Sequence, residues 1–220
     1  MKRKHLFRLI VSLLILLTIA VIPVSQPANP VVSPQKVETK LDQPSTSQLQ
    51  TLEVKGRAPK TGYTRTQFGD GWDVVNGCDM RNTILARDLL NIQQDSGCRV
   101  LSGELHDPYT GTQLSFVRGA STSSEVQIDH IVSLSNAWQT GAQLMTKTQR
   151  QQFANDPLEL IAVDGTSNQQ KSDGDAATWL PRNKSFRCTY VNLQIAVKAK
   201  YRLWVTQSEK AAMEQVLTTC

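Results

Sequence analysis

The chain has 220 residues, of which 40% are apolar, and this content suits a globular protein with one ordinary domain and argues against a wholly disordered chain. The formal net charge is +5, but four of the 24 basic residues lie in residues 1–30, which hold no acidic residue. The remaining 20 basic residues face 19 acidic ones, so overall charge does not identify a partner, and any basic surface must be local.

Residues 1–25 have the pattern of an export signal. A basic start, MKRKHLFR, precedes an apolar run at residues 9–22, which Pro23 ends. A run of about 14 residues is short for a membrane span and suits a secretory signal peptide. We therefore expect a secreted or extracytoplasmic protein. The alternative is an uncleaved segment, residues 9–22, that anchors the chain to a membrane.

Residues 26–50 are rich in Pro, Ser, Thr and Gln and have no hydrophobic periodicity. This composition predicts a disordered linker between the export segment and a folded domain at residues 51–220. The first part of that domain, residues 51–82, has no clear helical period and is expected to form loops and short turns.

The exported part contains four cysteines, at positions 78, 98, 188 and 220. An oxidising compartment and an even count favour two disulfides, and four cysteines allow three pairings. We prefer Cys78–Cys98 and Cys188–Cys220, because each pair brackets one helical segment. A zinc site built from cysteines is the alternative, and the lack of a C-x-x-C or Cys/His cluster argues against it.

The first predicted elements are a helix and a hairpin. Apolar residues recur on one helical face over residues 83–95, with Asp79 or Asn82 as N-cap. Residues 99–105 and 113–117 are β-prone and flank the turn sequence HDPYTG, so they predict a β-hairpin.

The centre of the chain predicts two strands separated by a helical detour. Its expected elements are a strand over 126–131, short helices around 137–138 and over 147–154, a strand over 158–163 and a helix near Asn168. Alternation along the first strand places His130 on one face and Asp129 on the other. Thr146 and Gln149 form a capping box for the helix over 147–154.

The C-terminal third is predicted to be helical and to cover the core. Apolar residues recur there at spacings of three and four: Tyr190, Leu193, Val197, Tyr201 and Trp204. Thr206 and Glu209 form a second capping box, which predicts the start of a last helix.

The joints of the central elements carry the candidate chemistry. Phosphodiester hydrolysis needs an activated water and a Lewis acid on the phosphate. His130 can act as the base, since its ordinary pKa lies near neutrality. Asp129 and the side-chain carbonyl of Asn168 are oxygen ligands of the kind that a divalent cation prefers; Mg²⁺ is favoured, with Mn²⁺ or another divalent ion as the alternative.

This stretch resembles the HNH endonuclease superfamily, the ββα-metal nucleases. DHIVSLS is similar to the first-strand signature of the superfamily, and LELIAVDGTSNQQKSD is similar to its second strand and helix. The resemblance implies that His130 is the general base and that Asp129 and Asn168 bind the metal. It also implies that Lys171 either contacts the phosphate or holds the helix. The fold expected from it is α+β: a ββα-metal core with an additional β-hairpin and a helical C-terminal cover.

Glu159 is where the chain departs from the superfamily pattern, which has Asn at this position to brace the loop that carries the base. Either the Glu159 carboxylate or Asn155, in the turn sequence NDP, is expected to take that role. Glu159 as a solvated strand residue and Asn155 as a simple turn former are the alternatives.

Further motifs, GCDMRN, AWQTGA and AATWLP, resemble an exported branch of the superfamily related to the C-terminal domain of GmrSD-type restriction endonucleases. That resemblance covers about residues 52–220 and implies that Arg81 contacts a substrate phosphate. The chain is therefore expected to be an exported, metal-dependent endonuclease that acts on nucleic acid, DNA more than RNA. No stable protein partner is implied, and membrane contact is expected only through an uncleaved N-terminal segment.

Each candidate residue also has a structural alternative. His130 could be a hydrogen-bonded polar residue at a strand end, Asp129 a loop cap and Asn168 a helix N-cap. Arg81 could be an ion-pair partner of Asp79 or a helix cap. At the level of function, the alternatives are an exported domain that binds nucleic acid or a wall polymer without turnover, and a disulfide-stapled structural domain.

Overall fold

The computed structural model describes residues 45–220, so the expected export segment and the first part of the expected linker lie outside the described residues. The described elements, in chain order, are α1 (Ser45–Thr51), η1 (Arg65–Phe68), β1 (Val74–Val75), β2 (Cys78–Asp79), α2 (Met80–Asp88), β3 (Leu90–Gln94), β4 (Val100–His106), β5 (Gln113–Val117), β6 (Val126–His130), α3 (Leu134–Gln139), η2 (Ala142–Leu144), α4 (Lys147–Ala154), β7 (Leu160–Asp164), α5 (Gly165–Lys171), η3 (Lys184–Phe186), α6 (Arg187–Tyr201) and α7 (Gln207–Leu217). The predicted mixture of helices and small antiparallel sheets is confirmed.

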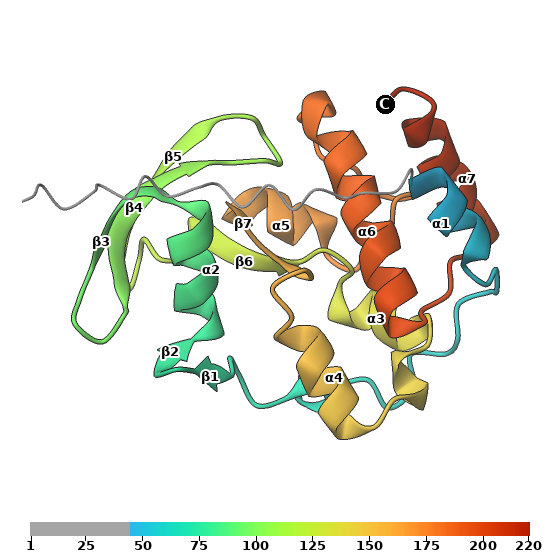
Figure 1. Cartoon of the computed structure of the whole chain (residues 1–220), viewed down its shortest axis with the longest axis horizontal. Coiled ribbons are helices and arrows are strands. Elements are labelled where there is room, and N and C mark those ends of the chain that lie inside the picture. The colour runs from blue at the N-terminus through green and yellow to red at the C-terminus, as the bar shows by residue number, and fades with distance from the viewer. Residues whose placement is uncertain (1–44) are drawn as a thin grey trace, which may run out of the picture. The chain divides into compact units, whose positions relative to one another are not determined.

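Strands β6 and β7 form an antiparallel pair in the middle of the domain, and α5 lies against it (Figure 1). The register runs from Val126 opposite Asp164 to His130 opposite Leu160. Asp164 is both the last residue of β7 and the N-cap of α5, because its Oδ1 accepts a hydrogen bond from the Ser167 amide at 2.7 Å. The second strand therefore passes directly into the helix.

A three-stranded sheet, in the order β3-β4-β5, lies beside this unit. The predicted hairpin of β4 and β5 is confirmed, but the helix predicted over residues 83–95 is wrong in its second half. Helix α2 ends at Asp88, whose Oδ2 accepts from the Ala162 amide of β7, and the chain continues as β3. The side chains of Leu89 and Ile92 pack closely on Gly103 of β4, so their apolar spacing serves a strand rather than a helix face.

Two apolar clusters meet at β6 and β7, and a third begins just after β6. Val126 and Ile128 belong to a cluster with α2 and the three-stranded sheet. Val163 belongs to a second cluster under α6 and α7, and Val132, just after β6, belongs to a third with α3 and α4. The two strands are thus held from several sides, which makes them a rigid support for polar side chains.

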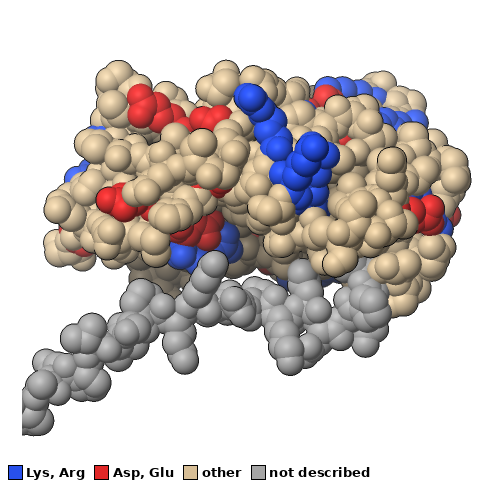
Figure 2. Space-filling model, turned by 90° about the horizontal axis from the view of Figure 1, so that it is seen from above, with Lys and Arg blue, Asp and Glu red and all other residues tan. Residues whose placement is uncertain are grey.

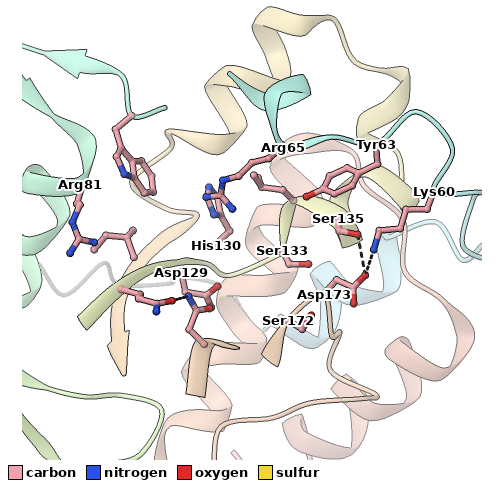
Figure 3. Close-up of a pocket in the computed structure, with 15 residues that line it drawn as sticks. Lys60, Tyr63, Arg65, Arg81, Asp129, His130, Ser133, Ser135, Ser172 and Asp173 are labelled. Carbon is pink, nitrogen blue, oxygen red and sulfur yellow. Dashed lines mark hydrogen bonds and ion pairs between the residues drawn. The ribbon is translucent and has the colours of Figure 1, made fainter. Parts of the chain in front are cut away.

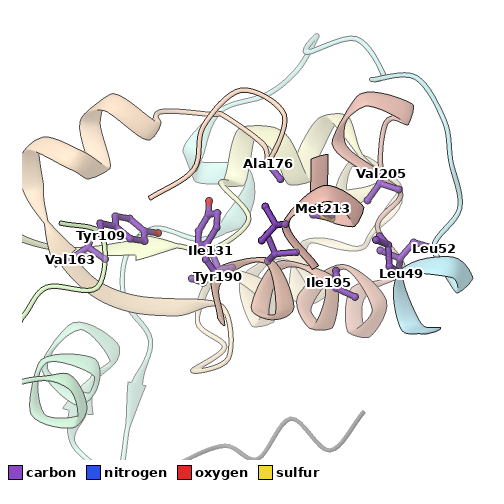
Figure 4. Close-up of a cluster of buried hydrophobic side chains, with 12 residues drawn as sticks. Leu49, Leu52, Tyr109, Ile131, Val163, Ala176, Tyr190, Ile195, Val205 and Met213 are labelled. Carbon is purple, nitrogen blue, oxygen red and sulfur yellow. The ribbon is translucent and has the colours of Figure 1, made fainter. Parts of the chain in front are cut away.

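Helices α6 and α7 pack together over the second cluster, as the predicted helical cover (Figure 4). Both predicted capping boxes, Thr146 with Gln149 and Thr206 with Glu209, are present. Helix α1 packs against α6 and α7, and Leu49 is fully buried among them. The folded part therefore begins by Ser45, inside the segment expected to be a linker.

The two preferred disulfides, Cys78–Cys98 and Cys188–Cys220, are both formed. The first ties the strand before α2 to the turn before β4, and the second ties the start of α6 to the residues after α7. Within residues 45–220, no helix combines the length and the apolar character that a membrane crossing requires.

Candidate functional site

A pocket of about 450 Å³ follows β6 and brings most of the expected site residues together (Figure 3). Its lining includes Asp129 and His130 of β6, Asn168 of α5 and Arg81 of α2. Asp129 and His130 leave the strand on opposite sides, as the alternation of a strand requires, and both still reach the pocket.

The His130 ring is buried and held on two sides. It stacks on Trp72 with a centroid distance of 5.9 Å and an interplanar angle of 9°. Its Nε2 lies 3.0 Å from the carbonyl oxygen of Ala154. Because a carbonyl can only accept a hydrogen bond, Nε2 carries the proton of the neutral ring, and Nδ1 is left as an acceptor.

Burial and the neighbouring charge of Arg65 lower the pKa of His130 to about 3. The imidazole is therefore neutral at physiological pH, with Nδ1 unprotonated. A neutral ring in one tautomer is the state that a proton acceptor needs.

Asn155 is the C-cap of α4 and follows Ala154, whose carbonyl contacts His130. Its Oδ1 accepts a hydrogen bond from the Asp73 amide at 2.8 Å, and its Nδ2 donates to the Gln151 carbonyl. The Asp73 bond holds the segment that carries Trp72, so Asn155 acts on the stacking partner of His130.

Glu159 is fully buried at the start of the second strand, which excludes the solvated alternative. Its two side-chain oxygens accept from the Val132 amide at 3.1 and 3.2 Å, and its backbone carbonyl accepts from the Ile131 amide at 2.7 Å. These bonds hold the two residues that follow His130. Burial raises the pKa of Glu159 well above its ordinary value.

Asp129 is bound by two buried side chains on its own side of the strand. Lys171 Nζ lies 3.0 Å from Oδ1 and 2.9 Å from Oδ2, and the Tyr109 hydroxyl donates to Oδ2 at 2.5 Å. Burial, with the Asp129 charge next, raises the pKa of Tyr109 well above its ordinary value, so the phenol keeps its proton as a donor.

Lys171 does not line the pocket; it is buried between α5 and β6. Its side chain is fully buried, and its Nζ also donates to the carbonyl oxygen of His130 at 2.7 Å. Of the two roles implied for this residue, holding the helix against the strand fits the position. A phosphate contact does not, because the ammonium group does not line the pocket.

Asn168 lies inside α5, and Asp164 is the N-cap of that helix, so the N-cap alternative for Asn168 is wrong. Its Nδ2 donates to Gln127 Oε1 at 2.9 Å. That bond orients the amide and leaves its Oδ1 free of any hydrogen bond within the part of the chain that the structure describes.

Arg81 lines the pocket but uses Nη2 for the carbonyl oxygens of Ser123 and Val126, at 3.2 and 3.1 Å. It forms no ion pair with Asp79, which instead caps α2 through the Asn82 amide. Arg81 therefore ties α2 to the start of β6.

The sequence pattern did not predict the pocket wall formed by Lys60, Tyr63, Arg65 and Trp72. The stretch TGYTRTQFGDGWD mixes aromatic and basic residues. They follow neither a helical nor a strand period, so nothing in the sequence indicates that they face one pocket. Tyr109, in the predicted turn, was missed for the same reason. Two further tryptophans lie in apolar clusters: Trp138 is buried in the third cluster, and Trp179 packs against the second.

The charges of the described surface are mixed. On the face in Figure 2, Lys and Arg side chains gather in a small central group, and Asp and Glu side chains lie mainly to one side. Among residues 45–220, no group of three or more His, Cys, Asp or Glu side chains could hold a metal ion.

Two comparisons with known proteins found similar sequences. Residues 79–216 match the family described as GmrSD restriction endonucleases, C-terminal domain. An uncharacterized secreted protein of Arthroderma benhamiae is 40% identical over 195 residues, which cover 86% of this chain and 92% of that protein. No solved structure matches the chain.

Proposed function

Because the chain belongs to the family of GmrSD restriction endonuclease C-terminal domains, we propose that it is an exported endonuclease that hydrolyses phosphodiester bonds of nucleic acid with a divalent cation. DNA is the preferred substrate over RNA. In this proposal β6, β7 and α5 are the ββα-metal core. The observation that carries it is the position of a neutral, singly oriented His130 in a pocket shared with Asp129 and Asn168.

His130 is the general base. With Nε2–H donating to the Ala154 carbonyl, Nδ1 takes a proton from the attacking water. The Trp72 stack holds the ring plane, and Asn155 holds the backbone beside Trp72. Glu159 positions the loop after His130 through the Val132 amide, which is the task of Asn in the superfamily pattern.

Asp129 and Asn168 are the side chains that would hold the cation. A carboxylate and an amide oxygen are the donor types that Mg²⁺ prefers, and Mg²⁺ keeps several waters, so two protein ligands suffice. Oδ1 of Asp129 accepts one hydrogen bond, from Lys171, and a carboxylate oxygen has a further lone pair. When bound, the cation would stabilise charge on the phosphate and on the leaving oxygen.

One observation favours a second candidate, an exported domain that binds nucleic acid or a wall polymer without turnover. The Asp129 carboxylate already neutralises Lys171, a fully buried cation, and accepts from Tyr109. A carboxylate committed to those partners offers a weaker attraction to a divalent ion.

The test is cleavage of supercoiled plasmid by the full chain in Mg²⁺, Mn²⁺ or EDTA, with RNA as a parallel substrate. His130→Ala is expected to lose cleavage by about 100-fold or more, the range for a general base. His106→Ala is the matched control, because His106 is exposed on β4 and outside the pocket. Circular dichroism of both variants checks that the fold is retained.

Equal cleavage by His130→Ala and the unchanged chain would show that His130 is not the base. If the unchanged chain binds nucleic acid but cuts neither DNA nor RNA with any of the ions, the second candidate is correct.

A further inference from the structure

One wall of the pocket comes from residues that precede the matched family range. Lys60, Tyr63, Arg65 and Trp72 line it, whereas the family match begins at residue 79. The match therefore assigns no role to these side chains, and their common position in the pocket wall comes from the tertiary structure alone.

The three cations that line the pocket differ in how they are engaged. Lys60 Nζ forms an ion pair with Asp173 at 2.9 Å, and Arg81 Nη2 donates to two backbone carbonyls. The Arg65 guanidinium forms no hydrogen bond or ion pair with any residue from 45 to 220. Arg65 is exposed, and its side chain extends toward His130 in Figure 3.

The backbone that carries Arg65 is firmly held, although its side chain is not. Phe68, at the end of the same short helix, is buried and packs against the rings of Trp138 and Phe153. Arg150 adds bonds from its guanidinium to the Gln67 carbonyl at 2.9 Å and to Gln67 Oε1 at 3.0 Å. The backbone beneath Arg65 is already ordered, so binding of a ligand to its free guanidinium costs little backbone conformational entropy.

We propose that Arg65 binds the phosphate group that is cleaved, on the His130 side of the pocket. This inference rests on the proposed function and deepens it, since the residue supplies a substrate contact that Lys171, which is buried, cannot make. The planar guanidinium matches two phosphate oxygens at once, and its charge is fixed at every working pH. Asp129 and Asn168 approach the same pocket from the other side of β6, so the phosphate lies between the cation ligands and Arg65.

The experiment compares Arg65→Ala and Arg65→Lys with Arg182→Ala, in the full chain. Arg182 is an exposed arginine outside the pocket, so its loss changes the net charge equally. Two readouts are taken: plasmid cleavage in Mg²⁺, and binding of a fluorescein-labelled DNA oligonucleotide in EDTA at several KCl concentrations.

Arg65→Ala is expected to lower kcat about 100-fold, as for the loss of one donor to developing charge. It should also reduce the slope of log affinity against log salt by about 0.7–0.9, the value for one phosphate contact. Arg65→Lys should restore the slope of log affinity against log salt but not kcat, because lysine returns the charge without the bidentate hydrogen bonds of a guanidinium. Arg182→Ala should leave kcat unchanged.

If the unchanged chain cuts DNA and Arg65→Ala cuts it equally well, the inference about Arg65 is wrong while the proposed function stands. If the unchanged chain binds but does not cut, the proposed function fails. The salt slope then decides on Arg65 alone: a slope equal to that of Arg182→Ala overturns the phosphate contact, and a smaller slope supports it.

Discussion

Replacing Lys171 by methionine is expected to lower the free energy of unfolding by about 3–5 kcal/mol, the cost of removing one partner of a buried ion pair. The Lys171 side chain is 0% exposed and that of Asp129 is 6% exposed, so solvent cannot take over the lost contact. Methionine keeps most of the side-chain volume. The loss therefore comes from a buried carboxylate left with Tyr109 as its remaining donor, and from the lost bond to the His130 carbonyl.

The measurement is urea unfolding with both disulfides intact, followed by tryptophan fluorescence. Lys55→Met is the matched control, because the Lys55–Glu53 pair is 52% and 59% exposed and such pairs contribute about 0–1 kcal/mol. The double variant Lys171→Met, Asp129→Asn should recover part of the loss, since no uncompensated charge remains. A loss below about 1 kcal/mol in Lys171→Met, equal to the control, would refute the reasoning.

Two further predictions concern Glu159 and Gly165. Burial raises the folded-state pKa of Glu159 above its unfolded value of about 4.3. The contribution of Glu159 to the free energy of unfolding is therefore fully present below the unfolded pKa. It is lost as pH rises through the folded pKa, at up to about 1.36 kcal/mol per pH unit. Glu159→Gln, which has no proton to lose, should gain stability relative to the unchanged chain as pH rises; parallel curves of unfolding free energy against pH would contradict this. A Cβ on Gly165 would lie 2.2 Å from the Ser124 carbonyl oxygen, so Gly165→Ala should cost about 1–3 kcal/mol in urea unfolding. Gly56→Ala meets nothing within 4 Å and is the control; equal stability of the two variants would contradict the close contact.

The elements that local sequence patterns predicted are those whose signals lie within a few neighbouring residues. Both capping boxes, the β4–β5 hairpin and the opposite faces of Asp129 and His130 are of this kind. The helix predicted over residues 83–95 failed in its second half because a spacing of apolar residues can suit either a helix or a strand. The pairing of β3 with β4, where Leu89 and Ile92 pack close to Gly103, is a contact that the local spacing does not contain.

The sequence by itself determined that an Asp-His pair ends one strand and that a second strand runs into a helix bearing Asn168 and Lys171. It favoured, among three possible pairings, the two cysteine pairs that form. Tertiary structure alone decided the partners of the charged side chains at the site. It buried Lys171 under Asp129 and left Arg65 free beside His130. The physical reason is that caps and periodicity act between near neighbours in the chain, whereas burial and charge pairing depend on segments that folding brings together from far apart.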